Sequence, residues 1–457
     1  MRGKGIGPWR WAALLLFGYV LARPVSTNQI LVPVLAAIGA LAAGTIFFAR
    51  RRLAPPLLPA LFATFLFALV GLITSPTNPG FVGALLVFVA APLLWWMAAV
   101  AVDERTLRAA LTTIAVVTVF VGGTIALYAA GNTGAIPQLM PSWLLDQYGA
   151  GFGGGRYTEV RLYGLSTLVA TGPLWVASLF VRRDALMPPQ WLRVIAAVAA
   201  TAGMLSGGRR ALALVLVLAP FLAWGIRVVL QGRRAGRLTV HGRVLVLAMG
   251  GLAVVGFMPG LVSGGVIGAA WRSVASYVTG AAFPEASAAD DRLRTYQADR
   301  LLEEWGRAPI FGRGFGATID GFARDPVEPW RWELQYHALF FQTGIVGITI
   351  IVVGALLTAN AIIRAARHRP DLVPSLVVAC TGAIGMLIGN ATNPYLQAPG
   401  HVWSIFLPVA IANVMLLSPP GRGAARARAA VDDVPAAVGA ASGTTHGPPD
   451  PSTRGST

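Results

Sequence analysis

The feature that most constrains the fold of this chain is a series of apolar runs, each about 20 residues long, that recurs along the sequence. A helix of that length crosses the hydrocarbon core of a bilayer. Charged residues make up only 12% of the 457 residues, whereas a soluble globule carries roughly 25%. The sequence therefore predicts an all-α, polytopic integral membrane protein.

We expect about 12 transmembrane helices from the apolar runs. They cover residues 9–22, 29–49, 55–75, 82–102, 109–130, 162–181, 191–206, 211–230, 244–260, 336–362, 372–390 and 402–418. Arginines recur in every second loop, at 50–52, 105–108, 182–193, 233–237, 364–367 and 422–426, and the alternate loops around 24–28, 76–81 and 390–401 are nearly free of them. Three outer segments, 131–161, 206–210 and 261–335, carry arginines and break this pattern. Because basic loops stay in the cytoplasm, both termini are expected to be cytoplasmic, in the cytoplasmic (inner) membrane.

The spans divide the chain into four parts. Residues 1–260 hold about nine spans. Residues 261–335 form one large extracytoplasmic loop with helical segments, since they are far longer than a connector needs to be. Residues 336–418 hold the last three spans, and residues 419–457, rich in Pro, Gly, Ala and Ser, read as a disordered cytoplasmic tail.

The net charge of +17 comes almost entirely from arginine, since Lys4 is the only lysine. In short loops between apolar runs, arginines set topology and contact anionic lipid headgroups. We expect membrane lipids and no nucleic acid as partners, because no basic-aromatic platform is present. Cys380 is the only cysteine and His401 an isolated histidine, so no metal site and no cofactor are expected.

Residues 291–305, in the large loop, have helical periodicity and contain neither Pro nor Gly. Arg294, Ala298, Leu301 and Trp305 fall on one stripe of that helix, flanked by Gln297 and Leu302, while Asp299 and Glu303 point away. An arginine on a packing face needs an anionic partner. That partner is either an acidic side chain of the same loop or an anionic ligand.

The segment Pro309–Gly316 is rich in glycine. Its spacing is not a dinucleotide fingerprint, because no strand precedes it and no βαβ unit surrounds it. We expect a turn that allows close backbone approach.

Two ionisable residues open the next span. Glu333 and His337 lie four positions apart, so a helix places them on one face with Gly344 and Gly347. Aligned with small residues at a membrane entry, they form a candidate acid/base site. The structural alternative is that Glu333 pairs with a loop arginine while His337 lies at the interface.

Further arginines lie on the extracytoplasmic side. Arg161 begins a span, where it could simply anchor the helix, and Arg209 and Arg210 lie in a two-glycine turn. Together with Arg294 they could surround one anion. Arginine suits phosphate because its planar guanidinium donates parallel hydrogen bonds, and a diphosphate at that depth would belong to a lipid-linked substrate.

These residues resemble the bacterial O-antigen ligase and O-antigen polymerase superfamily over roughly residues 105–415. The motifs that carry the resemblance are Arg161-Leu162-x-Gly164, Ser206-Gly-Gly-Arg-Arg, Arg294-x-x-Gln297, Leu301, Trp305, Pro309-Ile-Phe-Gly-x-Gly-Phe-Gly316, Glu333-x-x-Tyr336 and Gln342-Thr-Gly-Ile-Val-Gly347. The expected spans and the single large outer loop also match that family.

The resemblance implies metal-independent, inverting glycosyl transfer in cell-envelope polysaccharide biosynthesis, from a polyprenyl-diphosphate-linked glycan donor to a glycan or lipid acceptor. Arg161, Arg209 or Arg210, and Arg294 would bind the diphosphate. Many members carry a histidine as base where this chain has Glu333. We therefore expect Glu333 to be the base, with His337 as its neighbour or substitute.

Two other functions fit the predicted topology. A lipid-linked oligosaccharide flippase or another transporter would also have about 12 spans, but such proteins usually carry charged or broken helices at mid-membrane, in related halves. Another kind of glycosyltransferase would place an acidic pair in its first outer loop, and residues 24–28 contain no acid.

Overall fold

The computed structural model describes residues 7–25, 30–132, 134–147, 151–152, 160–207, 210–231, 284–323, 327–391 and 393–419. Apart from a two-residue ladder, Gly151–Phe152 (β1) with Val160–Arg161 (β2), the regular structure of this part is helical. Eight of its helices are long and apolar enough to cross a membrane. The prediction of an all-α polytopic membrane protein is therefore confirmed for this part of the chain.

The first half of the described chain contains ten helices and helical turns, nine before the β ladder and one after it. They are α1 (Pro8–Ala22), α2 (Leu31–Phe48), η1 (Pro55–Leu57), α3 (Leu58–Thr74), α4 (Phe81–Leu85), the π-helical turn η2 (Leu86–Ala90), α5 (Ala91–Ala101), α6 (Glu104–Asn132), α7 (Ser142–Gln147) and, after the ladder, η3 (Tyr163–Thr167).

The second half continues with α8 (Leu168–Ser178), α9 (Gln190–Ser206), α10 (Arg210–Gln231), α13 (Pro284–Arg307), α14 (Gln335–His368), η5 (Pro370–Leu372), α15 (Val373–Gly389), η6 (Tyr395–Gln397), η7 (Pro399–His401) and α16 (Trp403–Leu417). Each predicted span except 244–260, which lies outside the described residues, coincides with one of these helices or with a short series of them.

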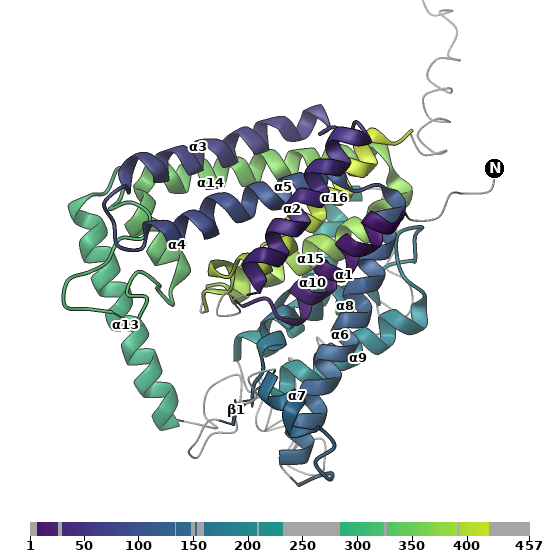
Figure 1. Cartoon of the computed structure of the whole chain (residues 1–457), viewed down its shortest axis with the longest axis horizontal. Helices are drawn as coiled ribbons and strands as arrows, with labels where there is room; N and C mark the ends of the chain where they lie inside the picture. Colours follow the sequence, from purple (N-terminus) through teal and green to yellow (C-terminus); the bar gives the residue numbers. More distant parts are fainter. Residues whose placement is uncertain are drawn as a thin grey trace, which may run out of the picture.

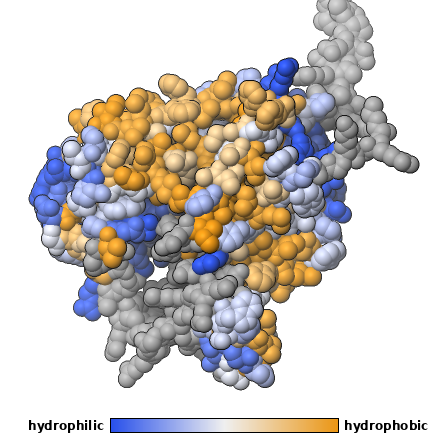
Figure 2. All heavy atoms as spheres, viewed as in Figure 1, coloured by the Kyte–Doolittle hydropathy of each residue, from blue (hydrophilic) through white to orange (hydrophobic). Residues whose placement is uncertain are grey.

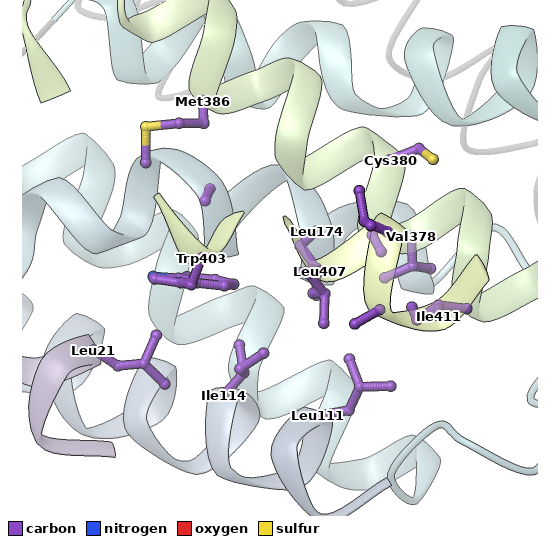
Figure 3. Close-up of a cluster of buried hydrophobic side chains, with 14 of the residues drawn as sticks. Leu21, Leu111, Ile114, Leu174, Val378, Cys380, Met386, Trp403, Leu407 and Ile411 are labelled. Carbon is purple, nitrogen blue, oxygen red and sulfur yellow. The ribbon is translucent and has the colours of Figure 1, made fainter. Parts of the chain in front are cut away.

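The helices form a bundle whose centre is α15 and α16. In their most apolar stretches, 78% of the residues of the α15 segment and 83% of the α16 segment are buried inside the protein, against 11% for α14. Figure 3 shows Trp403, Leu407 and Ile411 of α16 lying between side chains of α1, α6, α8 and α15. Because lipid tails are as apolar as leucine, the sparsely buried α14 loses nothing by facing the bilayer.

Figure 1 shows α3 and α14 running side by side, with α13 standing at one end of the bundle. Figure 2 shows a broad hydrophobic surface over this face of the bundle, with hydrophilic atoms gathered at the α13 end and at the opposite end. An apolar belt between two polar ends is the surface that a bilayer requires.

Helix ends that the charge pattern predicts to share one side of the membrane meet in the structure. Asp103, between α5 and α6, is bound by Arg10 of α1 at 2.8 Å and by Arg51, after α2, at 2.6 Å. Asp184, between α8 and α9, accepts hydrogen bonds from the backbone N–H and the hydroxyl of Ser375 in α15, both at 2.7 Å. The alternating direction of the helices is thus present in the fold.

Several arginines assigned to loops belong to helix ends instead. Arg105 and Arg108 lie in the first turns of α6, and Arg367 lies in the last turn of α14. Arg193 lies in α9, where it is 4% exposed and donates to the carbonyl of Ser178 at 2.7 Å. It thereby satisfies the carbonyl of the buried Ser178, at the C-terminal end of α8.

Candidate functional site

An arginine–glutamate pair joins α13 to the segment that precedes α14. The guanidinium of Arg294 donates to Oε1 of Glu333 through Nε at 3.0 Å and through Nη2 at 2.6 Å. The side chains of Arg294 and Glu333 are 28% and 11% exposed, so water screens their attraction only in part. Of the two partners that the sequence left open for Arg294, the structure provides the acidic side chain of the same loop.

Helix α13 presents this arginine on its packing face, as expected. The helix is longer than predicted, and its buried positions are Gln297, Leu301 and Glu304, which continue the stripe begun by Arg294. Leu302, predicted to flank this face, is 42% exposed. The packing face is therefore rotated towards Gln297 and Glu304, away from Leu302.

Glu333 lies outside the helix that was expected to carry it. Helix α14 begins at Gln335, and Leu334 before it has φ −85° and ψ 82°, which is not helical. The expectation that Glu333 and His337 share a helical face is therefore wrong. His337 lies half-buried in the first turn of α14.

Two glutamine amides hold the backbone on either side of Glu333. The side-chain oxygen of Gln297 accepts from the N–H of Leu334 at 3.2 Å, and Nε2 of Gln397 donates to the carbonyl of Trp332 at 2.9 Å. Trp332 itself is fully buried. These contacts take the place of the first helical turn, which explains why α14 starts only after Glu333.

Gln397 is a site residue that the sequence analysis missed. It lies in η6, in the connection between α15 and α16, and it is 6% exposed. The only signal available was a glutamine in a loop beside a span, and nothing in the sequence indicates that it reaches Trp332.

The segment Pro309–Gly316, here called the glycine clasp, inserts into a break in α14. At Gly344 the helix leaves its regular path, with φ 58° and ψ −165°. The N–H groups of Arg313 and Gly314 donate to the carbonyls of Phe341 and Gln342 at 2.8 and 2.9 Å. The clasp thereby satisfies the carbonyl groups that the interrupted helix leaves without a partner.

The backbone N–H groups on the other side of the break also find hydrogen-bond partners in the clasp. The N–H groups of Ile345 and Val346 donate to the carbonyls of Pro309 and Ile310 at 2.9 and 3.0 Å. A Cβ on Gly344 would lie 2.4 Å from the carbonyl oxygen of Ile310. The two backbones can approach this closely only because a glycine is present, as the turn predicted from the sequence requires.

The clasp also binds the turn between α3 and α4. The side-chain amide of Asn78 donates to the carbonyls of Arg313 and Phe315 at 2.9 and 3.0 Å, and the N–H of Gly80 donates to the carbonyl of Gly316 at 3.0 Å. The ring of Phe315 is fully buried. The clasp therefore fixes the end of α13 against both α14 and the first third of the chain.

For the other arginines predicted at the site, the structure describes at most the backbone. Arg161 ends β2 and Arg210 begins α10, but the side chains of both, and the whole of Arg209, lie outside the described residues. The segments that carry them are neighbours, because a Cβ on Gly207 would lie 2.7 Å from Cδ1 of Leu165 in η3. Their convergence on Arg294 stays a prediction.

His401 is buried and makes a hydrogen bond of 2.8 Å between its Nε2 and the hydroxyl of Ser166. Among the described residues, no group of three or more His, Cys, Asp or Glu side chains is placed to hold a metal ion. His401 thus connects η7 to η3 as a packing element.

The sequence was compared with models of known protein families and with curated proteins, and it matches none of them.

Proposed function

We propose that the chain transfers or polymerises a glycan, moving it from a polyprenyl-diphosphate carrier to an acceptor hydroxyl during cell-surface polysaccharide assembly. The observation that carries the proposal is the Arg294–Glu333 pair, a cation and a potential base held together beside the entry of α14. Helix α13 and the two glutamines supply the rigid frame that such a pair needs.

In the proposed reaction, Glu333 removes the proton from the acceptor hydroxyl as its oxygen attacks the anomeric carbon of the donor. The new carbon–oxygen bond forms as the bond from that carbon to the diphosphate breaks, and the bonding electrons leave with the phosphate oxygen. Attack opposite the leaving group inverts the anomeric configuration. The proton remains on Glu333 until it is lost to water.

Arginines would balance the charge that develops on the departing diphosphate. Arg294 is preorganised by Glu333, and Arg161 with Arg209 or Arg210 would complete the diphosphate site. In this scheme guanidinium groups do the work that a metal ion does in other glycosyltransferases. His337, one turn into α14, is assigned as neighbour or substitute of the base.

The proposal includes the topology predicted from the sequence. About 12 spans would cross the cytoplasmic membrane, with both termini in the cytoplasm and the α13 end outside it. A lipid carrier would then reach the Arg294–Glu333 pair from the outer leaflet, with a glycan or lipid acceptor arriving from the extracytoplasmic space.

A transporter or lipid-linked oligosaccharide flippase is the second candidate, and the break at Gly344 is the observation in its favour. Broken helices in transporters expose backbone groups to the cargo. Here the glycine clasp already occupies the carbonyls of Phe341 and Gln342 and the N–H groups beyond the break. That occupancy favours an architectural break, and hence the transferase.

The test is to replace Glu333 by Gln in cells that lack the chromosomal copy and to analyse their surface polysaccharide. Glu333→Gln should abolish the polymer or ligated product while the protein still accumulates in the membrane. Glu328→Gln is the matched control, because Glu328 also pairs with an arginine, Arg331, in the same loop. Product at the wild-type level in Glu333→Gln would remove this residue from the mechanism. Whether the surface polysaccharide is lost altogether or only has shorter chains would separate ligation from polymerisation.

A further inference from the structure

A polar cavity of about 350 Å³ lies beside the second half of α13. Seven polar or charged residues line it together with Ala317 and Ile319; they are Asn78, Arg300, Glu304, Arg307, Arg313, Thr318 and Asp320. Its walls come from α13, from the glycine clasp with the residues after it, and from Asn78 of the α3–α4 turn. We call it the α13 cavity.

A buried carboxylate sets the orientation of two guanidinium groups in the α13 cavity. Glu304 is 8% exposed, and its Oε1 and Oε2 bind Arg307 and Arg313 at 2.5 and 3.0 Å. Each guanidinium carries five N–H donors, so both arginines keep donors beyond those that Glu304 uses. The cavity therefore has fixed hydrogen-bond donors in its wall.

Arg300 adds a third guanidinium to this wall. It binds Glu303 at 2.6 Å, and its buried Nε has no hydrogen-bond partner among the described residues. Nη1 of Arg300 uses one N–H on Glu303, so the other Nη N–H groups remain as donors for a ligand in the cavity.

The charges of the α13 cavity balance. Three guanidinium groups are matched by the carboxylates of Glu304 and Asp320 in the wall and by Glu303, which also pairs with Arg307 at 2.9 Å. A balanced site does not concentrate anions. It offers donors and acceptors side by side, which suits hydroxyl groups, because each hydroxyl both donates and accepts.

The position of the cavity relates it to the Arg294–Glu333 pair. Glu304 follows Arg294 by ten residues on one helix, which is about 15 Å along its axis. A short oligosaccharide can bridge that distance, so a glycan that reacts at Glu333 can place more distant sugar units in the cavity.

We propose that the α13 cavity binds neutral, hydroxyl-rich sugar units of the glycan, away from the bond that reacts. This inference rests on the proposed function for the identity of the ligand as a glycan. It assigns Arg300, Arg307, Arg313 and Glu304 to substrate selection, with no part in the chemical step.

The experiment measures saccharide binding directly, by titration calorimetry on the full chain in lipid nanodiscs. The probe is the oligosaccharide released by mild acid from the surface polysaccharide of the cells that encode the chain. Arg300→Gln removes one wall donor, and Thr318→Phe fills the cavity. Arg331→Gln is the matched control, since Arg331 pairs with Glu328 three positions away and is 25% exposed, against 27% for Arg300.

Binding should weaken about tenfold in Arg300→Gln and in Thr318→Phe, stay unchanged in Arg331→Gln, and vary little between about 0.15 M and about 1 M salt. The inference is overturned if the wild-type chain does not bind the probe, or if the two cavity variants bind like the wild type. An affinity that falls steeply with salt would instead identify an anion site, such as one for a lipid phosphate.

The Glu333→Gln assay separates this inference from the proposed function. If Glu333→Gln makes normal product while Arg300→Gln loses binding, the transferase proposal fails and the saccharide site stands. If Glu333→Gln abolishes product while the cavity variants bind normally, only the cavity assignment fails.

Discussion

Two nitrogens of Arg294 converge on a single oxygen of Glu333, across 39 positions of sequence. This geometry leaves the guanidinium fixed in its plane, because rotation would break one of the two hydrogen bonds. A planar, fixed donor can present its remaining N–H groups to a phosphate in one orientation only. In the proposed reaction, the pair would provide the positional accuracy that catalysis by charge requires.

We expect Arg294→Lys to reduce surface polysaccharide at least ~10-fold, because an ammonium group cannot reproduce the planar guanidinium and the two hydrogen bonds that fix it on Glu333. The measurement is the amount of polymer per cell, normalised to the amount of protein in the membrane. Arg292→Lys, at an exposed arginine two positions before Arg294 in α13, should have no effect. Wild-type activity in Arg294→Lys would show that charge pairing alone is enough.

Gln397→Leu should lower activity several-fold while the protein stays folded. Loss of the hydrogen bond to the carbonyl of Trp332 costs about 1–3 kcal/mol locally and frees the backbone before Glu333. Polymer yield and thermal unfolding in detergent would be measured together. Gln190→Leu, an exposed glutamine at the start of α9, is the control. An unchanged yield in Gln397→Leu would rule out a positioning role.

Gly344→Ala should lower the unfolding temperature strongly, because a φ of 58° with a ψ of −165° is accessible to glycine only. The added methyl group would also collide with the carbonyl of Ile310. We expect a loss of ~3 kcal/mol or more, from backbone strain and overpacking together. Gly123→Ala in α6 has open space around its Cβ and should be neutral or stabilising. Equal unfolding temperatures for the two variants would contradict the role of the clasp.

Asp103 should make stability depend on pH. Burial raises the pKa of this carboxyl, but hydrogen bonds from Thr106 and the charges of Arg10 and Arg51 outweigh burial, so its pKa lies below the ordinary 3.8. A lowered pKa stabilises the fold above the unfolded value, and this stabilisation disappears as the pH falls through the folded value. The wild type should therefore unfold at a higher temperature than Asp103→Asn at neutral pH, and this gap should close below pH 3.8.

Asp184 should give stability a pH dependence of the opposite sign to that of Asp103. Burial raises its pKa despite hydrogen bonds from Ser375, Leu186 and Met187. Relative to Asp184→Asn, the wild type should lose stability as the pH rises above 3.8. If both variants followed the same trend, the assignment of charge states would be wrong.

The orientation of the chain in the membrane can be measured by cysteine labelling, because Cys380 is the only cysteine. Cys380 is buried, so it should give little background with a membrane-impermeant maleimide. A cysteine introduced at Thr318 should be labelled from outside intact spheroplasts, whereas one at Arg182 should be labelled only after the membrane is opened. The reverse pattern would invert the proposed orientation.

The sequence predicted the helices well because hydrophobic length and arginine position are local signals. It also predicted that Arg294 lies on a packing face and that Pro309–Gly316 allows close backbone approach. It left open whether Glu333 pairs with a loop arginine, and it could not name Arg294 as that arginine, because the contact depends on where α13 lies against α14.

Two features of the candidate site had no local signal. The late start of α14 is due to Gln297 and Gln397, which lie far from it in sequence. The break at Gly344 depends on replacement hydrogen bonds from the glycine clasp, and the same glycine in an isolated membrane helix would stay helical. The late start of α14 is the reason that a helical face shared by Glu333 and His337 was wrongly predicted.

The glycine clasp imposes an order on biosynthesis. Asn78 leaves the ribosome long before Phe315, the partner 237 positions later, so the α3–α4 turn exists without its partner while most of the chain is made. Helix α14 then enters the bilayer with backbone groups that only the clasp can satisfy. Completion of this late span is thereby coupled to the folding of the glycine clasp, and a chain that stops before the clasp leaves the α3–α4 turn without these hydrogen bonds.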